Sequence, residues 1–152
     1  MRYLLILLSL SSFASTPDLN SIVEILKHVE TNYNTEAIGD NGKAYGILQI
    51  HKIVIDDVNR IYGTTYIHQD AFNEVCAVEV FNLYIKAGIK RYEALRCRSP
   101  TEQDVVRFWN GGIYSGYKKK STLKYYRKYI QYKTKLNPVD SCRSRVKNYF
   151  IK

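Results

Sequence analysis

The chain has 152 residues, with 23 Lys or Arg, 14 Asp or Glu and a formal net charge of +9. This length fits one domain, and no segment after the N-terminus approaches the ~20 consecutive apolar residues of a membrane helix. The spacing of Cys76, Cys97 and Cys142 excludes a cysteine zinc site and a Cys-x-x-Cys redox pair.

Residues 1–15 have the pattern of a secretory signal peptide. A short basic start precedes the apolar run Leu4 to Leu10, and Ser12 and Ala14 are spaced for cleavage after Ala14. An uncleaved N-terminal anchor is the alternative. We expect an exported protein, periplasmic or extracellular, in which Cys97 and Cys142 are the preferred disulfide pair.

The next segment predicts a helix followed by a turn. Ser21-Ile22-Val23-Glu24 resembles a capping box. An apolar stripe at helical spacing follows, made of Ile22, Ile25, Leu26 and Val29. Glu30 then stands near the expected C-terminal end of this helix. Gly39-Asp40-Asn41-Gly42 predicts a tight turn at the tip of a small β-hairpin.

Apolar spacing predicts two further helices. The first ends near Gly63, and the apolar residues that predict it are Ile47, Ile50, Ile53, Val54, Val58 and Ile61. The second is the longest, from Phe72 to Leu95. Its candidate core residues are Phe72, Val75, Cys76, Val80, Leu83 and Tyr84.

Residues that are typical of turns and helix ends delimit the last two helices. Ser99-Pro100-Thr101-Glu102 begins one that contains Val105, Val106 and Phe108, and Trp109-Asn110-Gly111-Gly112 ends it. Residues 121–136 form a Tyr-rich basic helix, which Asn137-Pro138 breaks. The chain therefore reads as a mainly α domain over residues 16–136, with a small hairpin.

Positive charge is concentrated at the end of the chain. Residues 118–152 hold 12 Lys or Arg and a single acid, Asp140. Such a segment, including the basic tail 137–152, binds polyanions, and for an exported protein these are anionic cell-wall polymers or lipid headgroups. Basic residues between tyrosines also suit single-stranded nucleic acid, but we do not expect it as the partner. A solvated surface that keeps the protein soluble is the alternative.

Three stretches resemble one superfamily. Glu30-Thr31, Asn34-Thr35-Glu36-Ala37 and Tyr45-Gly46-Ile47-Leu48-Gln49-Ile50 resemble the Glu-Ser, Asn-x-x-Ala and Gly-Leu-x-Gln-Ile elements of soluble lytic transglycosylases (SLT domains). The same stretch is similar to animal lysozymes. Phe108-Trp109-Asn110-Gly111-Gly112 resembles the Tyr-Asn-Ala-Gly element of the transglycosylases, and Thr122-Leu123-Lys124-Tyr125 resembles their Thr-x-x-Tyr element. The resemblance implies a lysozyme-like α+β fold with the hairpin beside the catalytic helix.

Four positions and the length of one stretch depart from these patterns. Ala44 stands where animal lysozymes have an Asp, and the stretch between Glu30 and Tyr45 is shorter than theirs. Relative to transglycosylases, Gly39 replaces a frequent Ser, Trp109 replaces Tyr, and Ser121 replaces an acid. No departure falls on Glu30.

The resemblance implies that Glu30 is a general acid and then a general base. An apolar pocket keeps such a carboxyl protonated near neutral pH by penalising its charged form. The ordinary alternative is a solvated Glu at a helix end. Asp40 and Glu36 are the nearest candidates for a second carboxylate, although Asp40 also suits an Asx turn.

The other matched residues would position a glycan. Gln49 binds a sugar or satisfies backbone groups, and Asn110 binds substrate or caps its helix. Tyr125 would hydrogen-bond Glu30 or an acetamide. Trp109 and Tyr33 are candidate sugar platforms, with core packing the alternative for Trp109.

These inferences favour a peptidoglycan lytic transglycosylase acting between N-acetylmuramic acid and N-acetylglucosamine. A hydrolytic lysozyme using Asp40 or an activated water is the first alternative. An inactive lysozyme-like protein that binds glycans or polyanions is the second. His28, His51 and His68 show no metal-ligand spacing, so we expect no metal. We also expect no organic cofactor and a monomer.

Overall fold

A computed structural model describes residues 16–136. The predicted signal peptide, the basic tail and Cys142 lie outside these residues. The described part is mainly helical with one small antiparallel sheet, as predicted. None of its helices is long and apolar enough to cross a membrane.

Helix α1 (Leu19–Thr31) begins earlier than its apolar stripe indicates. Asp18 is the N-cap, and its carboxylate accepts hydrogen bonds from the Asn20 N–H at 3.0 Å and the Ser21 hydroxyl at 2.5 Å. The capping box predicted at Ser21 is therefore wrong, because Asp18 occupies the N-cap position and Ser21 lies inside the helix. The helix ends at Asn32, whose left-handed backbone (φ 53°) places Glu30 in the last turn.

The hairpin predicted at residues 39–42 is confirmed. Strands β1 (Ile38–Gly39) and β2 (Ala44–Tyr45) flank the 3₁₀ turn η1 (Asp40–Gly42), and Gly39 pairs with Ala44. A third strand that was not predicted, β3 (Ile50–His51), pairs with β2 and completes a sheet of order β1-β2-β3.

Helix α2 (Lys52–Tyr62) ends at Gly63 as predicted but begins later. Ile47 and Ile50 are buried, yet they lie in a turn and in β3. Gly46 and Gln49 both have left-handed backbones, with φ of 72° and 50°, and these interrupt any helix. A Cβ at position 46 would also collide with the Ala71 carbonyl, so only glycine fits there.

The 3₁₀ turn η2 (His68–Phe72) leads to the longest helix, α3 (Glu74–Arg96). Val80 and Tyr84 are buried as predicted, and Phe72 and Leu83 are half-buried. The prediction for Val75 is wrong, since 68% of it is exposed. Cys76 is half-buried rather than buried. The inward face of α3 instead begins at Ala77 and continues with Val80, Phe81, Tyr84, Ile85, Gly88 and Tyr92.

Helix α4 (Glu102–Gly111) and helix α5 (Ser121–Leu136) have the predicted bounds, and the 3₁₀ turn η3 (Gly116–Lys118) joins them. Thr101 and Asp104 form a reciprocal capping box at the start of α4. Gly112 ends the helix. The apolar core predicted for α4 is confirmed, because Val105, Val106 and Phe108 are fully buried.

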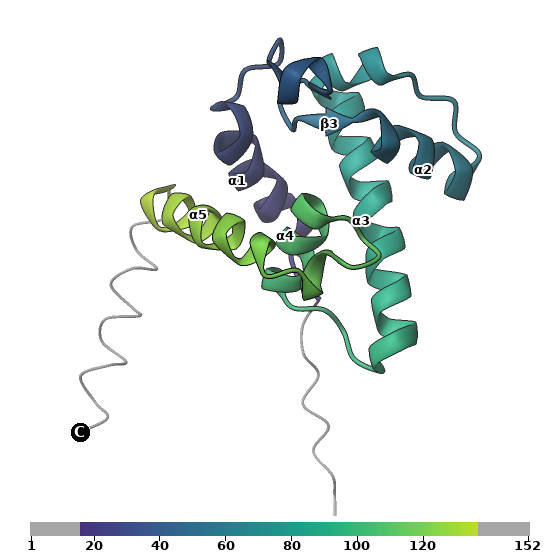
Figure 1. The fold of residues 1–152 in the computed structure, drawn as a ribbon, viewed down its shortest axis with the longest axis vertical. Helices are drawn as coiled ribbons and strands as arrows, with labels where there is room; N and C mark the ends of the chain where they lie inside the picture. The colour runs from purple at the N-terminus through teal and green to yellow at the C-terminus, as the bar shows by residue number, and fades with distance from the viewer. Residues whose placement is uncertain (1–15, 137–152) are drawn as a thin grey trace, which may run out of the picture.

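The buried apolar side chains form one core, and Figure 1 shows how the helices that supply them are arranged. Helix α2 packs on α3, while α4 packs on both α3 and α5. Helix α1 packs on α5 and α3, so the end of α1 that bears Glu30 lies among elements from distant parts of the chain.

Candidate active site

Glu30 lines a cavity of about 270 Å³ between the sheet and α4. The last turn of α1 supplies Glu30, and the other lining residues come from the hairpin, β3, α2 and the end of α4. They are Asp40, Ala44, Gln49, His51, Val54, Trp109 and Asn110. Five residues singled out from the sequence, including Ala44, are thus brought together with Glu30.

Two donors converge on one oxygen of Glu30. The Tyr125 hydroxyl donates to Oε1 at 2.5 Å, and the Trp109 indole N–H donates to the same atom at 3.3 Å. No described residue bonds to Oε2, which is not enclosed by protein. Because Oε1 already accepts two hydrogen bonds, the carboxyl proton belongs on Oε2, the oxygen free to meet a ligand.

The surroundings of Glu30 raise its pKa above the ordinary value of 4.5. Burial is the largest cause, because it penalises the charged form. The Tyr125 hydroxyl, the positive charge of Lys128 and the Trp109 indole oppose the shift by stabilising the carboxylate. Burial and the neighbouring Glu30 also raise the pKa of Tyr125 well above its usual value, so this phenol remains a donor.

Thr122 anchors the helix that carries Tyr125. Its hydroxyl is fully buried, accepts from Arg107 Nε at 2.9 Å and lies 2.9 Å from the Gly116 carbonyl oxygen. Arg107 also donates to the Lys119 carbonyl at 3.1 Å. Lys128 adds a second tie by donating to the Val29 carbonyl of α1 at 2.7 Å. In the Thr-x-x-Tyr element, Thr122 thus fixes the position of α5 and Tyr125 donates to Glu30. The sequence did not reveal that the two residues have these different roles.

Trp109 packs against other aromatic rings and also lies in the wall of the cavity. Its ring packs edge-on against Phe81 and Tyr84, at centroid distances of 5.2 and 6.4 Å. It also lines the cavity and donates to Glu30. The sequence did not lead us to predict the hydrogen bond from Trp109 to Glu30. Trp109 stands where the transglycosylase pattern has Tyr, and both side chains carry a hydrogen-bond donor. This shared donor was a signal that could have predicted the bond.

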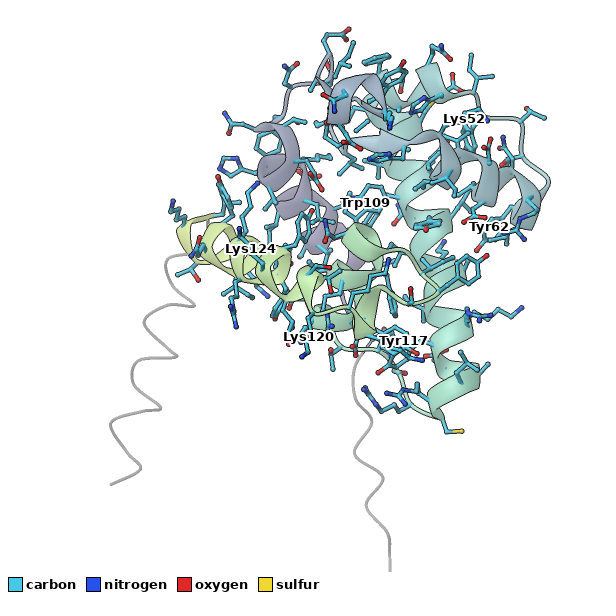
Figure 2. The ribbon with its side chains drawn as sticks, in the orientation of Figure 1. Lys52, Tyr62, Trp109, Tyr117, Lys120 and Lys124 are labelled. Carbon is cyan, nitrogen blue, oxygen red and sulfur yellow. The ribbon has the colours of Figure 1, made fainter. Side chains whose placement is uncertain are left out.

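Asn110 lies where three hollows meet. Besides the cavity of Glu30, it lines one of about 590 Å³ along α5 and one of about 570 Å³ beside α2 and Tyr114. We infer from this shared wall that the three hollows adjoin and form one open groove, which includes the cavity of Glu30. In Figure 2, Trp109 lies at the centre of the view, between Lys124 on α5 and Lys52 on α2.

Gln49 is held by the backbone and still lines the cavity. Its amide donates to the Gly46 carbonyl at 3.0 Å and the Ala37 carbonyl at 3.3 Å. The amide oxygen lies so close to Gly39 that a Cβ at position 39 would collide with it. Gly39, a departure from the transglycosylase pattern, therefore makes room for the Gln49 side chain.

Asp40 shares the cavity with Glu30, and its carboxylate lies 3.5 Å from His51 Nε2. Among the described residues, Glu30 and Asp40 are the carboxylates that line this cavity. Ala44, which pairs with His51 in the sheet, is buried in its wall. Glu36 is exposed and lies outside the cavity.

Tyr33 lies apart from these residues. Its ring stacks on His28 at 5.6 Å and its hydroxyl contacts the Glu24 carbonyl at 3.4 Å. It lines none of the three hollows. The structure therefore does not bring this candidate platform to Glu30.

No protein-family model matches the chain, and no curated protein matches it either. Within residues 16–136, no three His, Cys, Asp or Glu side chains gather in a way that would hold a metal ion.

Proposed function

We propose that the protein is an exported lytic transglycosylase that cleaves the β-1,4 bond between N-acetylmuramic acid and N-acetylglucosamine in peptidoglycan. The observation that carries the proposal is Glu30 itself. It combines a raised pKa, two donors on Oε1 and an Oε2 without a hydrogen bond, in a cavity that adjoins one hollow along α5 and another beside α2. A groove of this kind accommodates a linear polymer.

In the proposed first step, Glu30 acts as a general acid. Oε2 delivers its proton to the glycosidic oxygen, and the bond to the muramic acid C1 breaks. The acetamide of that sugar stabilises the positive charge at C1. Tyr125 and Trp109 stabilise the new carboxylate through Oε1.

In the second step, the ionised Glu30 acts as a general base. It removes the proton from the 6-hydroxyl of the same sugar, whose oxygen then bonds to C1 and closes a 1,6-anhydro ring. Glu30 regains its proton and no water is consumed. This route requires a single carboxylate, consistent with Ala44 at the position where animal lysozymes have an Asp.

The direct test is digestion of purified peptidoglycan by the mature protein and by Glu30→Gln. We expect the substitution to lower the release of soluble fragments by at least ~1,000-fold. Glu36→Gln is the matched control, because it removes an exposed carboxylate outside the cavity and should retain activity. Full activity of Glu30→Gln would refute the mechanism. Wall binding without fragments from the native protein would favour the non-catalytic alternative.

Hydrolysis is the second candidate, because Asp40 lines the same cavity as Glu30. A carboxylate there could activate a water molecule. Asp40→Ala separates the two reactions, since only the hydrolase would lose most of its activity. Asp56→Ala is a suitable control, because Asp56 pairs with Lys52 on the surface of α2.

A further inference from the structure

The two halves of the groove differ in charge. Lys124, Arg127 and Lys128 line the half along α5, together with four residues that carry no formal charge. These are Asn110, Ser121, Tyr125 and Gln131. None of the described residues that line this half is acidic. The half beside α2 contains Asp57 as well as Arg60 and Lys119.

The three cations belong to one face of α5. Positions 124, 127, 128 and 131 follow the spacing at which helical side chains are neighbours. Lys124 and Arg127 are exposed, and within residues 16–136 neither takes part in an ion pair. By contrast, Lys133 on the same helix pairs with Glu102 at 2.7 Å. The charges of Lys124 and Arg127 are therefore available to a ligand.

This cationic half adjoins the proposed site of cleavage. Tyr125 lines it, and the Tyr125 hydroxyl donates to Glu30. Asn110 lines both the cationic half and the cavity of Glu30. A group bound among these cations would thus be carried by a sugar at or next to the bond that Glu30 attacks.

We propose that the cationic half binds the carboxylates of the peptide attached to muramic acid, so that the enzyme prefers strands with free peptide carboxylates. This inference rests on the proposed function. Among the parts of a peptidoglycan strand, the glycan hydroxyls and acetamides are neutral, whereas the stem peptide carries carboxylates. Charge complementarity therefore selects the peptide, and the uneven groove fixes the direction of the strand.

The test compares two substrates that differ only in charge. One is soluble uncrosslinked glycan with its peptides intact, and the other is the same material with its carboxylates converted to amides. We expect the native protein to cleave the first roughly 3- to 10-fold faster at low salt, the range for a few exposed ion pairs. Salt should reduce this ratio.

Variants then test whether Lys124 and Arg127 cause the preference for the charged substrate. The double variant Lys124→Gln/Arg127→Gln should bring the ratio of the two rates towards one. Lys128 is left intact, because its charge also stabilises the ionised Glu30. Lys135→Gln is the matched control, since it removes one cation from α5 outside the groove and should keep the native ratio.

The outcomes separate the two proposals. A native ratio near one, or a native-like ratio in the double variant, would overturn the assignment of the cationic half while leaving the proposed cleavage intact. Release of no fragments from either substrate would overturn the proposed function itself, and this inference with it.

Discussion

Tyr125 and Glu30 are 95 positions apart in the sequence, and their side chains meet at 2.5 Å. The phenol belongs to α5 and the carboxyl to the last turn of α1, two helices that pack together. Their contact links the proposed acid to a helix that Thr122 and Arg107 fasten to the rest of the molecule. The chemistry of Glu30 thus depends on the docking of α5.

Tyr125→Phe should lower kcat roughly 10- to 100-fold, because the carboxylate formed in the first step loses its closest donor. The hydrogen bond lowers the pKa of Glu30, so its loss raises that pKa further. A general acid fails above its pKa, and the alkaline fall in activity should therefore move to higher pH. A pH profile of fragment release measures both effects.

Tyr126→Phe is the control for this substitution. Tyr126 is the next residue on α5 and is half-buried, but the hydrogen bonds to Glu30 come from Tyr125 and Trp109. Removal of the Tyr126 hydroxyl should leave the alkaline limb of the pH profile unshifted. An unshifted alkaline limb in Tyr125→Phe would contradict the role assigned to the phenol.

Trp109→Phe should shift the alkaline limb in the same direction, by less than Tyr125→Phe. The phenyl ring can retain the contacts with Phe81 and Tyr84, while the N–H bond to Oε1 is lost. This bond, at 3.3 Å, lowers the pKa of Glu30 less than the Tyr125 hydroxyl and the charge of Lys128 do. The comparison of the two pH profiles tests whether Tyr125 lowers the pKa of Glu30 more than Trp109 does.

Glu30→Gln should stabilise the folded protein at neutral pH while abolishing activity. Because burial raises the pKa of Glu30, the native state holds this proton more tightly than the unfolded state does. The native protein therefore loses stability as pH rises from the ordinary Glu pKa through the raised one. Gln does not titrate, so it escapes this loss.

Melting temperatures of the two proteins at about pH 4 and about pH 7 measure this effect. We expect Glu30→Gln to melt roughly 2–4 °C higher near neutral pH, with little difference in acid. A gain that is equal at both pH values would show that burial of charge is not its cause.

Thr122→Val should destabilise the fold by about 1–3 kcal/mol, because Arg107 Nε loses a buried acceptor. The isosteric Val keeps the packing volume, and Thr122→Ser keeps the hydroxyl as the control. Urea denaturation would rank Val as the less stable of the two. The reverse order would mean that the methyl group matters more than the hydrogen bond.

Much of this architecture was predictable from short local signals. Thr101 before an apolar stripe and Gly112 after it delimit α4, and Gly63 ends α2. Spacing alone could not separate helix from strand around Ile47 and Ile50, because both are buried and the interruption lies in the backbone at Gly46 and Gln49.

Part of the candidate site was predictable from the motifs of the sequence. Glu30, Gln49 and Asn110 do line a common cavity. Long-range packing decided the rest. The Trp109 bond to Glu30 and the buried Thr122–Arg107 pair depend on helices that meet only in the folded chain. Tyr33 lies beside His28 because the chain turns through left-handed conformations at Asn32 and Tyr33.

The most direct measurement is mass spectrometry of the fragments that the mature protein releases from purified peptidoglycan. Glycan ends in the 1,6-anhydro form, lighter than reducing ends by one water, are the result that proton transfer through Glu30 alone predicts. Reducing ends that disappear with Asp40→Ala would contradict this account and identify a hydrolase.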